Sequence, residues 1–405
     1  MSAVLLGGIV SLAFSREFYD SCITSAFFSI AIASAFIILA VLRRSWSDAL
    51  AVVVSGVLLA WLDLRILHYP YRSMGWFSFF GMASFAVLGL RTIWGQQRER
   101  NLMILGFAPT LLFVASEYVA SDLLDLTAKL HPKVFDLYLY YFDCSLRVQI
   151  AFLTGKLFVI APWLRSVCFL FYLALPFGLA LVYAARLRFS IRSAIPVTLA
   201  FLLTGPVGVL FYNMLPACGP IHVFGPRFPL FPVPLSGVVQ WHLQAIVLPG
   251  PPRNAIPSLH MTWVLLVWWS SRKLSPWIRT VAFAFLAFTA LATMGLGEHY
   301  FIDLVVAYPF AVMILSLCSY TIPFSHSARR IAFLWGIFVT LLWFALLSFA
   351  TQIFWISPVL PWAMVACTVA VSVVLQSRMQ TAIEAATVTP AEQPSEKISA
   401  MGHHA

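Results

Sequence analysis

Charge is what this sequence has least of. Charged residues make up 10% of its 405 residues, 61% are hydrophobic, and the mean hydropathy is +0.91. Soluble globular domains carry about a quarter charged residues, so this composition excludes an ordinary soluble domain. The apolar runs are long and continuous, whereas a membrane barrel would show short alternating strands. The sequence therefore predicts an all-α, polytopic integral membrane protein, since only helices and closed barrels span a bilayer.

Recognisable cofactor motifs are also missing. There is no Walker loop, no GxGxxG fingerprint, no HExxH zinc motif and no internal repeat. No two of the six cysteines have metal-ligand or redox spacing. The net charge of +10 is explained by Lys and Arg gathered on one side of a membrane, so it does not indicate nucleic-acid binding. We expect no cofactor and no nucleic-acid partner.

Eleven apolar stretches have the length expected of membrane spans, which is roughly 20 residues each. They are 21–42, 48–66, 75–94, 102–120, 163–185, 194–215, 256–271, 278–298, 302–322, 331–352 and 354–376. We divide the chain into N-terminal accessory spans (1–101), a six-span core (102–322), C-terminal accessory spans (323–376) and a disordered polar tail (377–405). The segment 3–14 is too short to span and is expected to lie in the membrane interface.

Basic residues fall in every second connection. Pairs or clusters of Lys and Arg follow the first, third, fifth, seventh and ninth spans, at 43–44, 98–100, 186–192, 272–279 and 329–330. The positive-inside rule places these connections in the cytoplasm. The N-terminus is then outside and the C-terminus inside, in a plasma or inner membrane.

One turn that leads into an apolar helix combines several phosphate-binding features. It reads Arg253-Asn254-Ala255-Ile256-Pro257-Ser258-Leu259-His260. Proline suits a first helical turn, so we expect the helix to begin near Pro257. The N–H groups of a helix start attract phosphate. Arg253 adds a permanent cation, Ser258 a hydroxyl and His260 a group that exchanges protons near neutral pH.

A second motif follows about forty residues later. Glu298-His299-Tyr300-Phe301-Ile302-Asp303 stands at the edge of the next apolar run. In a helix, His299 and Asp303 would be four residues apart on one face, so the carboxylate can orient and polarise the imidazole. The predicted topology puts His260 and His299 at the same, non-cytoplasmic face. The Pro- and Gly-rich loop between 216 and 254 lies there too, and its length indicates a functional role.

The stretches IPSLH (256–260) and HYFIDLVVAY (299–308) resemble the second and third motifs of the type 2 phosphatidic acid phosphatase superfamily. Within that superfamily, the likeness is closest to the branch of inositol phosphorylceramide synthases and sphingomyelin synthases. The resemblance covers about 102–322. It implies an all-helical membrane enzyme that cleaves a phosphoester of a lipid and needs no metal.

The resemblance also implies residue roles. His299 would be the nucleophile that forms a phosphohistidine, Asp303 would orient it, and His260 would protonate the leaving oxygen. The phosphate-binding candidates are Arg253, Ser258, Asn254, Arg227 and Tyr300. The expected partner is a membrane lipid. A second lipid or a polyol as acceptor would make the enzyme a phosphotransferase, whereas water would make it a phosphatase.

Two departures from the superfamily concern its cations. The first motif, a lysine followed by an arginine-proline pair, is absent, and Ala292 and Thr293 stand where Ser-Arg usually opens the third motif. Arg253 and Arg227 are the candidates to compensate for these losses.

Three other functions remain open at this stage. The first is a simple phosphatase acting on phosphatidic acid or polyprenyl phosphate. The second is a zinc site built from His260, Glu298, His299 and Asp303. The third is a transporter in which His299 and Asp303 relay protons, although matching broken helices in two halves, as in inverted repeats, are not evident. Arg91, Glu117 and Arg165 are charges near or within spans to which the sequence assigns no role.

Overall fold

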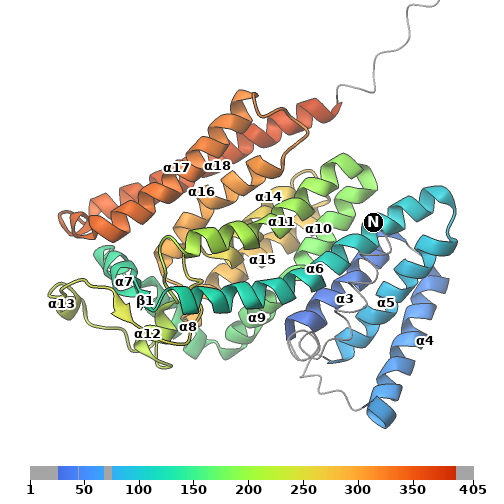
Figure 1. Ribbon diagram of the computed structural model, residues 1–405, viewed down its shortest axis with the longest axis horizontal. Coiled ribbons are helices and arrows are strands. Elements are labelled where there is room, and N and C mark those ends of the chain that lie inside the picture. Colours follow the sequence, from blue (N-terminus) through green and yellow to red (C-terminus); the bar gives the residue numbers. More distant parts are fainter. Residues whose placement is uncertain (1–25, 44, 68–74, 389–405) are drawn as a thin grey trace, which may run out of the picture.

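The described part of the protein is an all-α bundle with one short pair of β-strands, as the composition predicts (Figure 1). The structure, a computed structural model, describes residues 26–43, 45–67 and 75–388. The interfacial segment expected at 3–14 lies outside these residues. The side chain of Glu117 is likewise not described.

The N-terminal unit is a group of apolar helices, coloured blue to teal in Figure 1. Its elements are α3 (Ala26–Leu42), α4 (Trp46–Leu62), the π-helical η2 (Asp63–Leu67), α5 (Gly75–Trp94) and α6 (Gln97–Leu130). Helix α3 packs between α5 and α10, which attaches the unit to the core, whereas α4 packs chiefly on α5. Helix α6 belongs to both parts, because it also contacts α11 and α10.

The core follows in the order of the chain. Its elements are β1 (Lys133–Val134), α7 (Asp136–Ser145), α8 (Ile150–Ile160), α9 (Pro162–Leu173), α10 (Leu175–Phe189), α11 (Ile191–Tyr212), α12 (Pro220–Phe224), α13 (Leu235–Val238), β2 (Ile246–Val247), α14 (Leu259–Ser270), α15 (Pro276–Gly295) and α16 (Phe301–Cys318). The chain ends in α17 (Ser327–Phe349), the 3₁₀ turn η3 (Thr351–Trp355) and α18 (Val359–Val388).

The helices that carry the two motifs form the centre of the bundle. In α16, 83% of the residues are buried, compared with 22% in the outer span that begins at Trp46. Helix α14 is surrounded by α10, α11, α15 and α16, and most of its twelve residues are buried. Helices that are apolar all round are expected to be buried on all sides. Both motifs therefore lie at the ends of helices that are buried at the centre of the bundle.

Seven helices of the described chain are long and apolar enough to cross a membrane, or eight if the pair α8–α9, bent by 117°, is one span. The predicted count of eleven is therefore not confirmed. Among the fully described stretches, 163–185 and 256–271 do not pass as single spans, whereas 21–42 and 102–120 include residues whose backbone or side chains the structure does not describe. Helix α14 is about 18 Å long at ~1.5 Å per residue, which is short of a bilayer core of ~30 Å. The stretch 163–185 is divided at Ala174, just before Pro176.

The C-terminal boundary also differs from the expectation. Helix α18 continues to Val388, so residues 377–388 are helical where a disordered tail was predicted. Met379 is fully buried, and Glu384 forms ion pairs with Arg272 and Lys273. The helix therefore continues because its last turns pack on the connection after α14.

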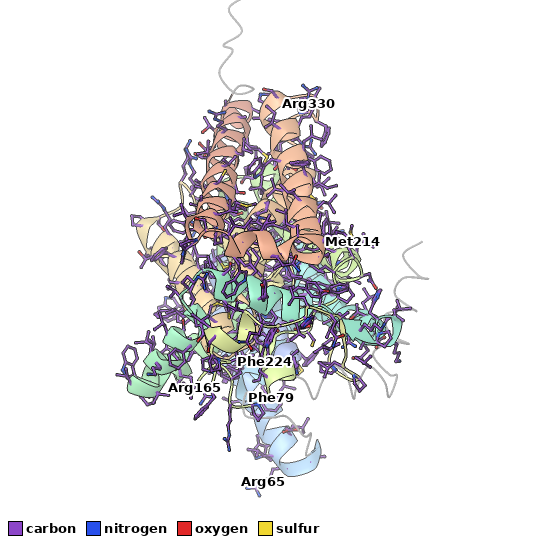
Figure 2. All side chains as sticks on the ribbon, turned by 90° about the vertical axis from the view of Figure 1, so that its left-hand side faces the viewer. Arg65, Phe79, Arg165, Met214, Phe224 and Arg330 are labelled. Atoms are coloured by element: carbon purple, nitrogen blue, oxygen red, sulfur yellow. The ribbon has the colours of Figure 1, made fainter. Side chains whose placement is uncertain are left out.

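The longest connecting segments of the core lie at one end of the bundle. Helices α7, α8, α12 and α13 lie together there, at the left of Figure 1. Strand β1 pairs antiparallel with β2, which joins the start of α7 to the Pro-rich loop. Figure 2 views the molecule from this end: Phe224 of α12 lies between Arg65 and Arg330, which mark opposite edges. The N-terminal unit and the C-terminal helices thus flank the core on opposite sides.

At the opposite ends of the helices, basic side chains join the connections to one another. The Arg186 guanidinium donates to the Ser270 carbonyl at 2.6 Å and to the Arg272 carbonyl at 3.1 Å. Lys273 lies 2.7 Å from Glu384. These contacts bring together the ends of α10, α14 and α18.

Candidate active site

The first motif forms a capped helix start. Ser258 is the N-cap of α14, and its hydroxyl accepts from the Met261 N–H at 3.4 Å. The helix therefore begins at Leu259, and Pro257 precedes the cap instead of occupying the first turn as we expected. The Ser258 N–H donates to the Asp303 carbonyl at 3.2 Å, so the cap residue already links the two motifs.

The second motif is a tight turn between α15 and α16. The Thr293 carbonyl accepts from the N–H groups of Glu298 and His299, each at 3.2 Å. Gly297 has a φ of +77°, a conformation that glycine adopts without strain. This turn reverses the chain and fixes the backbone of His299 before α16 begins.

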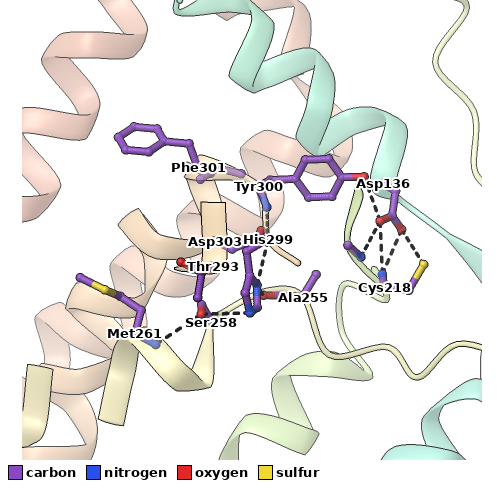
Figure 3. Close-up of polar contacts among 12 residues, drawn as sticks. Asp136, Cys218, Ala255, Ser258, Met261, Thr293, His299, Tyr300, Phe301 and Asp303 are labelled. Carbon is purple, nitrogen blue, oxygen red and sulfur yellow. Dashed lines mark hydrogen bonds and ion pairs between the residues drawn. The ribbon is translucent and has the colours of Figure 1, made fainter. Parts of the chain in front are cut away.

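The contacts of His299 define its tautomer (Figure 3). Its Nδ1 lies 3.0 Å from the Ala255 carbonyl oxygen and 3.3 Å from Oδ2 of Asp303. Both neighbours are acceptors, so Nδ1 carries the proton. In neutral imidazole the other nitrogen is then an acceptor, and Nε2 receives the Ser258 hydroxyl at 3.2 Å. The nitrogen with the free electron pair therefore points to the start of α14.

Asp303 serves the same turn with a second bond. Its Oδ2 accepts from the Tyr300 N–H at 2.8 Å, next to its contact with His299. The carboxylate is completely buried, and Oδ1 has no hydrogen-bond partner among the residues that the structure describes. Asp303 thus favours the Nδ1-protonated tautomer of His299 and also fixes the backbone at Tyr300.

His260 is held in a different way. Its ring stacks on Tyr172 with 4.0 Å between ring centroids and contacts Trp263 edge-on at 5.7 Å. Neither ring nitrogen forms a hydrogen bond within the described part of the chain, and the ring lines a cavity. His260 therefore has a fixed ring plane and nitrogens available to a ligand.

Two further carboxylates, both from α7, hold the second motif from behind. Asp143 accepts from the N–H groups of Phe301 and Ile302 at 2.6 and 3.1 Å, which caps α16. Asp136 accepts the Tyr300 hydroxyl at 3.0 Å. The sequence motifs did not identify either residue as part of the site.

Burial dominates the protonation of both α7 carboxyl groups. It raises the pKa of Asp136 to about 6, against the lowering effect of hydrogen bonds from Cys218, Tyr300 and Gly219. Burial also raises the pKa of Asp143 well above its usual range, although the N–H groups of Phe301 and Ile302 favour its charged form. Among the described residues, neither carboxyl group forms an ion pair with a basic side chain.

The Pro-rich loop packs directly on the histidine turn. The Ile221 N–H donates to the Gly297 carbonyl at 2.9 Å. A Cβ on Gly219, whose φ is +94°, would lie 2.2 Å from the Glu298 carbonyl oxygen. Only glycine fits this approach, so the loop is part of the site's structure.

Arg253 lies beside the site in sequence, but its side chain is directed into the protein. It is fully buried, and its guanidinium donates to the carbonyls of His131 at 2.8 Å, Leu248 at 2.6 Å and Pro251. Its main-chain N–H donates to Thr127 at 2.9 Å. In this structure Arg253 fastens the loop and does not point at the histidines.

The other expected phosphate ligands are also distributed unevenly. Arg227 is exposed and stacks on Phe231, and the Tyr300 hydroxyl is taken by Asp136. Asn254 is half-buried, and its amide has no hydrogen bond among the described residues. Ser258 and Asn254 are therefore the two expected phosphate ligands whose side chains are not directed elsewhere. Within the described chain, no group of three or more His, Cys, Asp or Glu side chains is arranged to hold a metal ion.

Residues 137–317 match the family model of the PAP2 superfamily. The matched segment contains His260, His299, Asp303 and Asp143, and it covers most of the core. The match suggests a membrane enzyme of the lipid phosphatase type. Comparisons with curated proteins and with solved structures gave no match.

Proposed function

We propose that the protein transfers a phosphoryl-type group from a membrane lipid through a phosphohistidine at His299. The observation that carries this proposal is the arrangement of that ring: two acceptors at Nδ1 leave the electron pair of Nε2 directed at the start of α14. A nucleophile requires such an oriented pair. The family match over 137–317 supports the same chemistry.

The reaction has two balanced steps. Nε2 of His299 attacks phosphorus, the P–O bond to the leaving alcohol breaks, and His260 gives the oxygen its proton. An alcohol or water then attacks the phosphorus, the P–N bond breaks, and His260 takes a proton back. Asp303 stabilises the imidazolium of the intermediate. Ser258 and Asn254 hold the phosphoryl oxygens once the lipid displaces the resting contact between Ser258 and His299.

The acceptor distinguishes a phosphotransferase from a phosphatase. We favour transfer to a second lipid or a polyol, by resemblance to the inositol phosphorylceramide synthase branch. The test is to incubate purified protein with labelled phospholipids, with and without ceramide or diacylglycerol, and to identify the products by mass. A phosphorylated acceptor supports transfer, whereas free phosphate in all mixtures supports the phosphatase. Activity is expected to survive a strong chelator, because no step requires a metal.

A second candidate arises from the contact between Ser258 and His299. Ser258, His299 and Asp303 are joined at 3.2 and 3.3 Å in the order of a serine hydrolase triad. In that reaction Ser258 would attack an acyl carbon. A fluorophosphonate probe distinguishes the two: stoichiometric labelling of Ser258 supports acyl transfer, and its absence in active enzyme supports the phosphohistidine.

The proposed site faces the non-cytoplasmic side. The grouping of Arg186, Arg272 and Lys273 at the far end of the helices supports this orientation. Ser236 and Ser327 are both exposed and lie in connections on opposite sides of the predicted topology. With the native cysteines removed, an impermeant thiol reagent added to intact cells is expected to label Ser236→Cys and not Ser327→Cys.

A further inference from the structure

His260 forms part of the wall of an apolar cavity of about 180 Å³. The cavity is lined by residues of α6, α9, α10, α11 and α14 and by Ala31 of α3. Along α11 its lining runs from Phe201 to Val209, which is about 12 Å at ~1.5 Å per residue. The cavity therefore extends along α11 and has a proposed catalytic ring in its wall.

The lining is almost entirely hydrocarbon and aromatic. Phe113, Leu124, Phe201, Val209 and Trp263 are typical members. The Trp263 N–H already donates to the Phe201 carbonyl at 3.1 Å, and the Ser116 hydroxyl to the Phe113 carbonyl at 2.8 Å. Apolar cavities of ~150 Å³ stay dry and accept small hydrocarbons. This cavity suits a hydrocarbon chain and not a polar head group.

His299 lines a separate and much smaller cavity, of about 20 Å³. Tyr140, Asp143 and Gln149 also line it, and Gln149 donates to the Val233 carbonyl at 3.0 Å. The two histidines thus adjoin different surroundings: His299 has polar groups beside it, and His260 has the apolar cavity. A substrate that spans both rings has its polar part at His299 and its apolar part beyond His260.

Gly205 keeps the cavity open. A Cβ built on it meets nothing within 4 Å, whereas one on Gly208, a turn further along α11, would lie 2.6 Å from Leu259. A side chain at 205 therefore causes no clash with the described atoms and enters the cavity instead. Because this position is inside a helix, a larger residue also removes the cost of glycine there, about 1 kcal/mol relative to alanine.

We infer that the cavity beside His260 holds the hydrocarbon of the leaving alcohol, and that Gly205 determines which chains fit. The inference rests on the proposed function, because it takes His260 as the proton donor to that alcohol. The bond that breaks then joins phosphorus to the oxygen of the apolar alcohol. The group kept on His299 is the phosphate, with any polar substituent it carries.

The test compares dihexanoyl and dioleoyl phosphatidic acid as substrates of the full-length protein. Gly205→Leu is expected to lower kcat/KM for the long-chain lipid roughly tenfold more than for the short-chain lipid, in the range seen when a hydrocarbon pocket changes by a few carbons. Gly205→Ala is expected to give a smaller shift. Leu210→Trp, on an exposed part of the same helix, adds bulk outside the cavity and is expected to leave the ratio unchanged.

Equal losses on both lipids, or no loss on either, in Gly205→Leu would overturn the inference. A second readout needs no turnover: a dioleoyl analogue with a photoreactive group in its chain is expected to cross-link within 201–209 or at Trp263. Cross-links confined to other helices would also overturn it. Wild-type protein that cleaves no phosphoester but still cross-links there would contradict the proposed function and leave the chain site intact.

Discussion

Buried carboxylates are held differently in the N-terminal unit and in the core. Asp48 of α4 is buried between two arginines, with Arg91 at 2.5 Å and Arg43 on its other oxygen. Arg91, which had no role in the sequence, thereby has a structural one. In the core, Asp136, Asp143 and Asp303 accept from main-chain N–H groups, a tyrosine hydroxyl and an imidazole.

The difference indicates two reasons for burying a carboxylate: to join helices through an ion pair, or to position a catalytic group. An ion pair compensates the charge of Asp48 and joins two helices, which accounts for its burial. The core carboxylates have no arginine beside them among the described residues, so their burial costs more. All three converge on residues 299–303, which suggests that the position of His299 is the reason for keeping them. The following predictions test this comparison, from the largest expected effect on kcat to the smallest.

Asp303→Asn is expected to reduce kcat by about 10³–10⁴-fold. The amide can donate to Nδ1 of His299, which favours the wrong tautomer, and a comparable change in a serine protease triad has an effect near 10⁴. Turnover of a lipid phosphate by purified variant measures this. The thermal midpoint in detergent is the control for folding. A variant with more than a tenth of wild-type activity would contradict the role of Asp303.

His260→Ala is expected to lose about 10²–10⁴-fold on a natural lipid and far less on a nitrophenyl phosphate ester. A general acid matters when the leaving oxygen is basic, and nitrophenolate leaves without a proton. The ratio of the two losses is the measurement. Equal losses on both substrates would remove the acid role and leave His260 as a wall of the cavity.

Asp143→Asn is expected to lower kcat by roughly 10–100-fold, with little change in KM. One of the two N–H groups at the start of α16 would then face an amide NH₂, which shifts the backbone next to His299, and small misplacements of catalytic groups have effects of this size. The rate of phosphoenzyme formation should fall with kcat. Unchanged formation would restrict Asp143 to folding.

Asp48→Asn is the matched variant in the other region. We expect it to destabilise the protein by roughly 1–2 kcal/mol, less than a fully buried pair would lose, because its arginines are partly exposed. Specific activity of the folded protein should equal that of wild type. A kcat loss as large as that of Asp143→Asn would erase the distinction between the two regions.

The last prediction concerns the pH dependence of stability, with no change in kcat. The pKa of Asp136 is raised from 3.8 to about 6 by burial, so the folded protein binds this proton more tightly than the unfolded chain does. Its contribution to stability is complete below pH 4 and is lost as pH rises through about 6. The thermal midpoint of wild type should therefore fall relative to Asp136→Asn across this interval. Parallel curves would contradict the raised pKa.

The sequence predicted the positions of the helices better than the residues that surround the site. The stretches 194–215 and 302–322 correspond to α11 and α16 within a few residues, because long apolar runs define them. The short α14 was taken for a span, because its apolar character reflects burial among other helices. The contact between His299 and Asp303 was expected from helical spacing, but His299 lies in the turn before α16, so the contact comes from the start of the helix and not from one helical face.

The supporting contacts were not predictable, because they join distant parts of the chain. Asp143 caps a helix that begins 158 residues later. Arg253 was assigned to phosphate because of its place next to Ser258, yet its donors meet carbonyls at His131 and Leu248. The sequence shows which residue types stand near the motifs. Which of their side chains face the site depends on how the connecting segments pack on the core, and that packing cannot be predicted from local spacing.

The most direct test of the phosphohistidine is to trap it. Purified protein is mixed briefly with lipid carrying a labelled phosphate, without acceptor, quenched in alkali, digested and mapped by mass spectrometry. His260→Ala with nitrophenyl phosphate serves as a second source of trapped enzyme, because donation of the proton to the leaving group is not needed there. We predict label on His299, lost in acid and absent from His299→Ala. Label on Ser258, or turnover without any labelled histidine, would contradict the account.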